Sequence, residues 1–323
     1  MNATAPIAAL AAALLLPAGA LAQAYPVKPV RLIIPYATGG SADFVGRILA
    51  QKLTESLGQQ VLPDNRAGAN GNIGVELAAK ANPDGYSLLL ASEIQFVINP
   101  AAFPDLKQGL LKAFDPITLI TVAYNLMVIN PELPVKSVKE LVAYAKANPG
   151  KINYGSPGTA SPNHLSMELL GLQTGTKMVH VPYKGAAQVL PDLMSGRIQV
   201  LMASIPAVLP QLGTGRIRIL GVGGPERLPN MKDVPTVAEQ GFPWFESSVA
   251  WSLFSNAGTP KAVINRLHAE TVKLLKEPDV RERFDKAGLT PIGSTPAQLA
   301  ARLKEDLNKW PKVIREAGIK VQE

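Results

Sequence analysis

Short apolar runs that suit β-strands alternate along this chain with stretches of helical periodicity. The first run, Val30–Ile34, stops at Pro35 and is followed by apolar residues at helical spacing over residues 42–57. Further strand-like runs at residues 87–91, 178–181, 198–202 and 217–222 are separated by helical patterns such as residues 137–147 and 162–172. This alternation predicts an α/β fold with mostly parallel sheets and helices on both faces. Ligands of such folds bind beyond the carboxyl ends of the strands.

The composition excludes several classes of protein. None of the 323 residues is cysteine, which removes disulfides, zinc-thiolate sites, iron–sulfur clusters and thiol nucleophiles. The formal net charge is +7, from 32 Lys and Arg against 25 Asp and Glu, but the basic residues are scattered and only 6% of residues are aromatic. A nucleic-acid partner would need clustered charge and stacking side chains, so we expect none.

The first residues have the pattern of a secretory signal peptide. An apolar stretch at residues 7–16 is followed by Pro17 and Gly19 and then by small residues, although the start of the chain lacks Lys and Arg. We expect residues 1–24 to be removed, with cleavage after Ala22 or Ala24, and the protein to reach the periplasm. The later apolar stretch at residues 117–129 is too short to span a bilayer.

Three glycine-rich loops follow predicted strands. The first loop (residues 36–43) contains Gly39 and Gly40, followed by Ser41, which we expect to cap the next helix. The second loop (residues 156–161) leads into a helix that we expect to begin at Pro162, and the third loop spans residues 182–187. A helix N-terminus offers free N–H groups and the positive end of a dipole. Two such loops facing each other would hold an anion through the backbone.

No motif for nucleotide binding, metal binding or catalysis is present. Gly39 and Gly40 lack the spacing of a dinucleotide fingerprint, and the histidines His164, His180 and His268 lack metal-ligand spacing. We therefore predict no metal, no cofactor and no catalytic residue. An exported hydrolase acting on a small anionic substrate is the alternative, but Ser156 or Ser161 with His164 would still need an acid that the sequence does not place.

Two residues of the first predicted helix suit a structural pair. Asp43 and Arg47 are four positions apart, and Asp43 stands in the first turn, where a negative charge is favourable. An ion pair between them would explain both without a ligand. The tryptophans Trp244 and Trp251 flank a second chain crossing between domains and suit either hinge packing or ligand stacking.

Motifs in a fixed order resemble one known family. They are Pro35-Tyr36-Ala37-x-Gly39-Gly40-x-x-Asp43-x-x-x-Arg47, Asn65-Arg66-x-Gly68-Ala69-x-Gly71-x-Ile73-Gly74, Pro83-Asp84-Gly85-Tyr86, Asn99-Pro100, His180-Val181-Pro182-Tyr183-Lys184-Gly185, Val234-Pro235-Thr236-Val237-Ala238-Glu239-Gln240-Gly241 and Gly258-Thr259-Pro260. Together they cover nearly the whole mature chain and resemble the tripartite tricarboxylate transporter substrate-binding family, also called the Bug family.

The resemblance implies a type II-like periplasmic binding protein. Two doubly wound α/β domains, residues 25–123 plus 249–323 and residues 124–248, would close over a ligand cleft, with two chain crossings as the hinge. A carboxylate ligand would be held by main-chain amides and bridging waters from the first and second loops, and passed to a two-subunit membrane permease unless the protein is an orphan receptor. We expect a monomer. The candidate ligand-binding residues are Tyr36, Thr38, Gly39, Gly40, Ser41, Asp43, Glu93, Gln95, Ser156, Gly158, Thr159, Ala160, Ser161, Tyr183 and Ser204.

One segment departs from the family pattern. After the strand at residues 87–91, the family has small or hydroxyl residues where this chain has Glu93, Ile94, Gln95 and Phe96. Glu93 would point either into the cleft or into solvent. In the cleft it would repel a second ligand carboxylate, which favours a monocarboxylate, or a carboxylate bearing a donor group, over citrate-like tricarboxylates, with Gln95 as a second polar contact.

Overall fold

The computed structural model describes residues 25–103, 106, 109–183, 185 and 188–320, so the predicted signal peptide lies outside the described residues. The strands are β1 (Val30–Ile34), β2 (Val61–Asn65), β3 (Ser87–Ala91), β4 (Phe114–Ile129), β5 (Asn153–Ser156), β6 (Val179–Pro182), β7 (Val200–Ser204), β8 (Arg218–Val222), β9 (Ser248–Asn256) and β10 (Thr290–Pro291). The α-helices are α1 (Ser41–Leu57), α2 (Asn72–Ala79), α3 (Asn99–Ala102), α4 (Val138–Ala147), α5 (Pro162–Thr174), α6 (Val189–Met194), α7 (Ile205–Val208), α8 (Lys261–Leu274), α9 (Pro278–Lys286) and α10 (Pro296–Glu316). Short 3-10 or π turns lie at Ala69–Gly71, Ile94–Ile98, Leu110–Ala113 and Leu209–Gln211.

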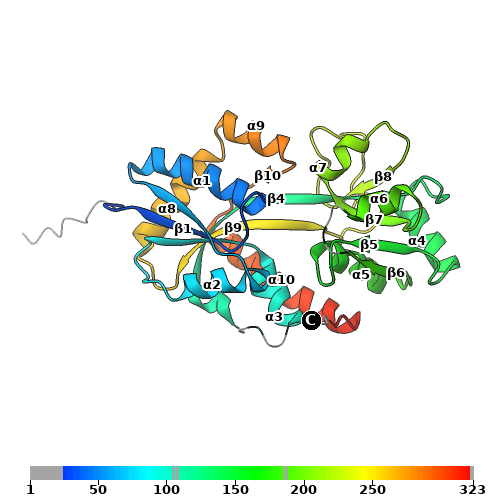
Figure 1. Cartoon of the computed structure of the whole chain (residues 1–323), viewed down its shortest axis with the longest axis horizontal. Helices are drawn as coiled ribbons and strands as arrows, with labels where there is room; N and C mark the ends of the chain where they lie inside the picture. Colours follow the sequence, from blue (N-terminus) through cyan, green and yellow to red (C-terminus); the bar gives the residue numbers. More distant parts are fainter. Residues whose placement is uncertain (1–24, 104–105, 107–108, 184, 186–187, 321–323) are drawn as a thin grey trace, which may run out of the picture.

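These elements form two lobes (Figure 1). In the first lobe, β2, β1, β3, β9 and the N-terminal half of β4 lie side by side, and β10 pairs with β4. The helices of this lobe are α1, α2, α3, α8, α9 and α10. In the second lobe, the C-terminal half of β4 pairs with β7 and β8, β5 lies between β7 and β6, and the helices are α4 to α7. The division into domains at the residues given above remains a prediction.

The expectation of mostly parallel sheets is wrong. Among the described residues, β1 with β2, β1 with β3, β5 with β6 and β5 with β7 are parallel, while the five pairings that involve β4 or β9 are antiparallel. The physical reason is that β4 carries the chain out of the first lobe and β9 carries it back. Strands that run in opposite directions between the same lobes pair antiparallel.

The two chain crossings are also fastened together beyond the end of the β4–β9 pairing. The Asn125 amide N donates to the Ser247 carbonyl at 2.9 Å, and the Asn125 side chain donates to the Ser247 hydroxyl at 3.1 Å. The Ser166 hydroxyl of α5 also donates to the Ser247 hydroxyl, at 2.9 Å. Buried polar groups are normally satisfied in this way, and here the bonds fasten the outgoing and returning strands together.

Apolar periodicity explains the cores. The strand β1 is buried on both faces, and α1 buries one side, with Val45, Ile48 and Leu53 fully inside the first lobe. A further core joins Leu165 and Leu169 of α5 to apolar residues of α10, so the last helix contacts both lobes. Within the described part of the chain, no helix combines the length and the apolar character needed to cross a membrane.

Candidate functional site

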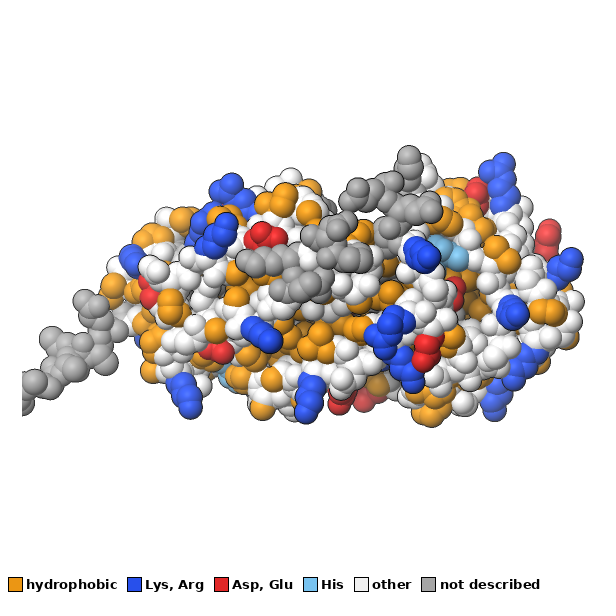
Figure 2. Space-filling view, turned by 90° about the horizontal axis from the view of Figure 1, so that it is seen from below, with side chains coloured by type: hydrophobic (Ala, Val, Ile, Leu, Met, Phe, Trp, Pro, Cys, Tyr) orange, Lys and Arg blue, Asp and Glu red, His pale blue; other side chains and the backbone are white. Residues whose placement is uncertain are grey.

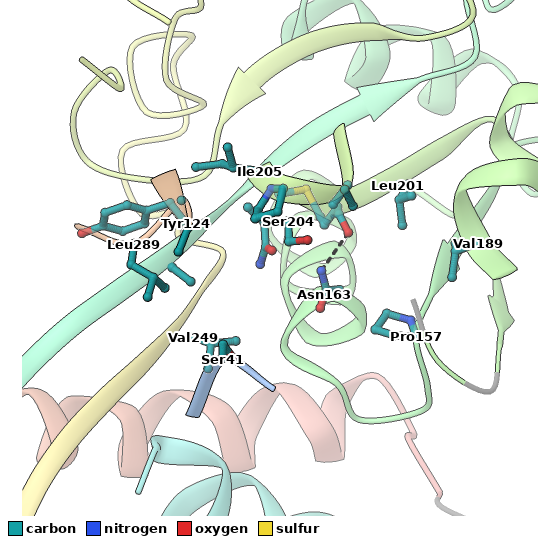
Figure 3. A pocket seen from close by; sticks show the side chains of 18 of the residues that line it. Ser41, Tyr124, Pro157, Asn163, Val189, Leu201, Ser204, Ile205, Val249 and Leu289 are labelled. Atoms are coloured by element: carbon teal, nitrogen blue, oxygen red, sulfur yellow. Dashed lines mark hydrogen bonds between the residues drawn. The ribbon is translucent and has the colours of Figure 1, made fainter. Parts of the chain in front are cut away.

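A cavity of about 350 Å³ lies between the lobes (Figure 3). From the first lobe and β4, the lining residues are Ser41, Ile94, Ala123, Tyr124, Asn125, Val249, Trp251, Ala287, Gly288 and Leu289. From the second lobe they are Pro157, Asn163, Val189, Leu190, Leu201, Met202, Ala203, Ser204, Ile205, Pro206 and Ala207. In Figure 3, Ser41 and Val249 lie on one side of this space and Ser204 and Ile205 on the other. Because both lobes contribute walls, a molecule bound here would contact each of them.

The lining is mostly apolar and uncharged. Among the described residues of the lining there is no Lys, Arg, Asp, Glu or His. The Asn163 side chain is held in place by a 2.7 Å bond that it donates to the Met202 carbonyl, drawn in Figure 3. Ser41 and Ser204 are exposed. Away from the cavity, Lys and Arg are spread over both lobes on the face shown in Figure 2, without gathering in one patch.

The first loop is held from below by Asp43. The Asp43 Oδ2 atom accepts the Gly39 amide at 2.9 Å and the Arg47 Nε–H at 2.9 Å, so the expected i, i+4 pair is present. The hydrogen bond from Arg47 lowers the pKa of this buried carboxyl. Gly39 has φ +88°, a left-handed conformation that glycine adopts without steric cost. Asp43 therefore shapes the loop, and it does not line the cavity.

Helix α1 begins with unsatisfied amides. The expectation that Ser41 caps this helix is wrong, because Ser41 is its first residue and the N-cap is Gly40, in extended conformation with no side-chain cap bond. The first intrahelical bond runs from the Phe44 amide to the Gly40 carbonyl at 2.9 Å. The amides of residues 41–43 have no intrahelical acceptor. With Ser41 in the lining, this end of α1 faces the cavity.

Two other candidate residues support the first loop from behind. The Tyr36 hydroxyl accepts a 2.5 Å bond from the Gln95 side-chain amide and lies 3.1 Å from the Ser92 hydroxyl, while its ring packs edge-on against Trp251 at 5.1 Å. Burial raises the pKa of Tyr36 to about 12, so its hydroxyl stays protonated. Gln95 is fully buried and also donates to the Asn70 carbonyl at 3.0 Å. Of the first loop, only Ser41 reaches the lining; Thr38 does not.

Glu93 takes neither of the two orientations expected from the sequence. It is 7% exposed, so it does not point into solvent, and it is not among the cavity-lining residues. Its Oε2 atom accepts the Ala250 amide at 3.2 Å. Burial, assisted by the negative charge of Asp306, raises the pKa of Glu93 to about 8. The turn of Ile94–Ile98 directs Ile94 to the cavity and Glu93 inward, toward α10.

Most amides of the second loop already donate hydrogen bonds within the protein. Gly158 donates to the Ser156 hydroxyl at 3.3 Å, Ala160 donates to the His164 Nδ1 atom at 3.0 Å, and Ser161 donates to the Gly158 carbonyl at 3.2 Å. Ser161 caps α5, and Pro162 stands at its first position as expected. The loop places Pro157 in the lining, while Ser156, Gly158, Thr159, Ala160 and Ser161 lie outside it.

The remaining candidate residues differ in whether they line the cavity. Ser204 lines the cavity; it is the last residue of β7 and the N-cap of α7. Tyr183 does not, because its hydroxyl donates to Asp192 Oδ2 at 2.7 Å. The third-loop residues Lys184, Ala186 and Ala187 lie outside the described residues.

Sequence reasoning missed most of the apolar walls. Residues 205–207, at the start of α7, and residues 287–289, between α9 and β10, line the cavity although they are far apart in sequence. Apolar residues in a wall look the same as core residues in a sequence. Asn163 carried a signal, because it is a polar residue in the first turn of the helix that follows the second loop.

The arrangement does not suit a hydrolase. The Ser156 hydroxyl lies 2.7 Å from His180 Nε2, which resembles part of a catalytic pair. However, Ser156 is fully buried and its hydroxyl donates to the Gly158 carbonyl at 2.9 Å. A nucleophile needs access to a substrate and a base that can take its proton. Among the described residues, no group of three His, Asp or Glu is placed to hold a metal ion.

Comparison with known proteins gives consistent matches. The family model described as the tripartite tricarboxylate transporter family receptor matches residues 45–319. Among solved structures, R. palustris Rpa4515 with adipate is 32% identical, with a TM-score of 0.74, over 92% of this chain and 99% of that chain. The periplasmic binding protein BugD is 30% identical, with a TM-score of 0.70, over 92% and 100%. MatC (Rpa3494) from Rhodopseudomonas palustris with bound malate is 28% identical, with a TM-score of 0.69, over 90% and 100%.

Proposed function

Because the chain belongs to the tripartite tricarboxylate transporter family of periplasmic solute-binding receptors, we propose that its interlobe cavity captures a small solute that carries a carboxylate. Membership confirms three predictions from the sequence: the family, the α/β periplasmic-binding-protein fold, and a binding protein rather than an enzyme. The signal peptide and its cleavage site stay predictions.

The observation that carries this proposal is the uncapped start of α1 at the cavity wall. Its amides at residues 41–43 have no intrahelical acceptor and point the positive end of a 17-residue helix toward the ligand space. In the absence of a side-chain cap, a ligand carboxylate can take these donors. The described lining has no carboxylate to repel an anion or to attract a cation.

The first and second loops contribute unequally to binding of the ligand carboxylate. Three amides of the second loop, at Gly158, Ala160 and Ser161, are already bonded within the protein, whereas the first turn of α1 is open. We therefore assign the main carboxylate contact to the first loop. The second loop, through Pro157 and the neighbouring Asn163, closes the opposite side of the ligand.

The walls indicate the class of carboxylate. Relatives in this family were solved with adipate and with malate, so different acids suit the same fold. Here the wall opposite α1 is built from apolar residues such as Leu201 and Ile205, and the described lining offers no cation for a second or third charge. Burying an unpaired charge is costly. We assign a carboxylate with an apolar body, such as a monocarboxylate, ahead of citrate-like acids.

Calorimetry with matched ligands tests the proposal. Hexanoate should bind, while hexanamide and hexylammonium, which share its apolar body but lack the carboxylate, should bind at least about tenfold more weakly. Adipate, malate and citrate extend the series, and citrate should be the weakest acid. Tighter binding of hexylammonium than hexanoate would overturn the carboxylate assignment. Conversion of any ligand to product, followed by NMR, would overturn the binding-protein function.

Delivery of the ligand is the remaining part of the proposal. As a monomeric receptor, the protein would hand its ligand to a two-subunit membrane permease of the same transporter family, or act as an orphan receptor. Uptake of labelled hexanoate by cells with and without the gene separates these roles. Uptake that does not depend on the protein, together with tight binding by the purified protein, supports the orphan role.

A further inference from the structure

Two imidazole rings stack on each other beneath the second loop. The rings of His164, from α5, and His180, from β6, lie 3.6 Å apart between centroids at an angle of 9°. The Tyr154 ring lies beside them, 5.1 Å from His180 and 6.1 Å from His164. His164 is buried at 4% exposed, whereas His180, on the edge strand β6, is half-buried.

Each ring holds one end of the second loop. The His164 Nδ1 atom accepts the Ala160 amide at 3.0 Å, and His180 Nε2 lies 2.7 Å from the Ser156 hydroxyl. Because that hydroxyl donates its proton to the Gly158 carbonyl at 2.9 Å, His180 must be the donor in its contact. In these contacts His164 Nδ1 therefore carries no proton, and His180 carries one on Nε2.

The loop needs this support because its backbone is strained. Ala160 has φ +60°, in the left-handed region that residues with a Cβ seldom occupy. Such a conformation persists only where the surroundings enforce it. The bond from the Ala160 amide to His164 is the contact that fixes this residue, directly before the cap of α5 at Ser161.

We propose that His164 and His180 are positioning residues, whose stacked rings hold the second loop in the shape that closes the ligand cavity. The inference rests on the proposed function, since Pro157 of this loop lines the cavity. Without the acceptor at His164 Nδ1, the Ala160 amide would lose this partner and the loop would loosen at the cavity.

Two other titratable side chains act on the pair. Glu168, four residues along α5, has its Oε1 atom 3.7 Å from His164 Nε2 and accepts a bond from the Tyr154 hydroxyl. Burial, followed by the repulsion of His164, lowers the pKa of His180 to about 4. His180 therefore stays neutral at ordinary pH.

Matched substitutions separate positioning from packing. The His164→Asn side chain can present an acceptor near the place of Nδ1, and the His180→Gln side chain a donor near the place of Nε2, whereas His164→Leu and His180→Leu keep bulk without these groups. At pH 7.5 the leucine variants should bind hexanoate about tenfold more weakly than wild type, with faster hydrogen exchange of residues 156–164. The asparagine and glutamine variants should stay within about threefold.

The outcomes decide between the two proposals. Equal affinity and equal exchange in His164→Leu and wild type would overturn the positioning role, as would equal losses in His164→Asn and His164→Leu. If wild type binds no hexanoate, the ligand proposal fails, while exchange of residues 156–164 still tests the pair. If the leucine variants do not fold, exchange of residues 156–164 in His164→Asn and His180→Gln decides: protection like that of wild type supports the role, and faster exchange overturns it.

Discussion

The Glu93 carboxylate and the Ala250 amide form a 3.2 Å hydrogen bond in the interior, where β9 passes the turn of Ile94–Ile98. Close by, the guanidinium of Arg302 from α10 bonds to Glu246 at 2.7 Å. A carboxyl that the sequence offered as a ligand contact therefore belongs to the packing between β9 and α10. Because this carboxyl is buried, the stability of the folded protein should depend on whether it is ionised.

The Glu93→Gln variant should be more stable than wild type at alkaline pH. The pKa of Glu93 is raised to about 8 from 4.5, so between these values the folded state binds more protons than the unfolded state. Wild type consequently loses stability as pH rises through this window, and glutamine does not. Urea unfolding at pH 5 and pH 8.5 should show the advantage only at the higher pH. The exposed Glu305→Gln serves as the control, and an equal gain at both pH values would contradict the burial argument.

The Gly39→Ala variant should destabilise the first loop. Its φ of +88° costs a residue with a Cβ about 1–2 kcal/mol, although a Cβ there would meet no atom within 4 Å. The loss is therefore conformational and not steric. Chemical denaturation measures it, and the matched variant Gly40→Ala, at a φ of −86°, should cost less. Equal losses at the two positions would contradict the explanation.

The Gly40→Ser variant should weaken ligand binding while leaving the protein as stable or slightly more stable. Gly40 is the N-cap of α1 in extended conformation, where the serine side-chain oxygen can accept a hydrogen bond from a first-turn amide for a gain of a few tenths of a kcal/mol. That oxygen would occupy the donors we assign to the ligand carboxylate. Calorimetry with hexanoate measures the change, with Gly40→Ala as the control for added bulk. Unchanged affinity in Gly40→Ser would place the carboxylate elsewhere.

Acidification should cost stability through His180. Its pKa is lowered to about 4 from 6.5, so between these values the unfolded state binds more protons. The folded state is therefore favoured above pH 6.5 and loses this advantage as pH falls toward 4. Urea unfolding of wild type and His180→Gln at pH 7.5, 5.5 and 4.5 isolates the contribution from that of the carboxylates. The stability of wild type relative to the variant should fall with pH; a constant difference would show that His180 does not titrate in this range.

The local sequence pattern predicted most helices and strands well, because helix and strand preferences depend on neighbouring residues. The strands Val30–Ile34 and Ser87–Ala91 have the predicted bounds, and Ser161 and Pro162 start α5 as expected. The β7 strand begins at Val200, two residues later than predicted, and includes Ser204. The direction of the strands was the main error, since pairing depends on how the chain returns between the lobes.

The candidate site was predicted less completely than the fold. Ser41 and Ser204 reach the cavity as candidates from the sequence, whereas Gln95 and Glu93 turn inward. A glycine-rich loop after a strand indicates where the backbone can approach a ligand. It does not say which neighbouring side chains face that ligand, because the direction of each side chain depends on how the following turn folds and packs.

The sequence by itself determined the family, the α/β class and the positions of the loops, because these depend on residue order and on local conformational preference. Only the tertiary structure decided that α1 starts without a side-chain cap, that amides of the second loop donate hydrogen bonds within the protein, and that His164 stacks on His180. The start of α1 and the loop bonds depend on the exact backbone conformation, and the stacked rings join α5 to β6. The free energy of such contacts depends on distance and burial in three dimensions, which residue order alone does not specify.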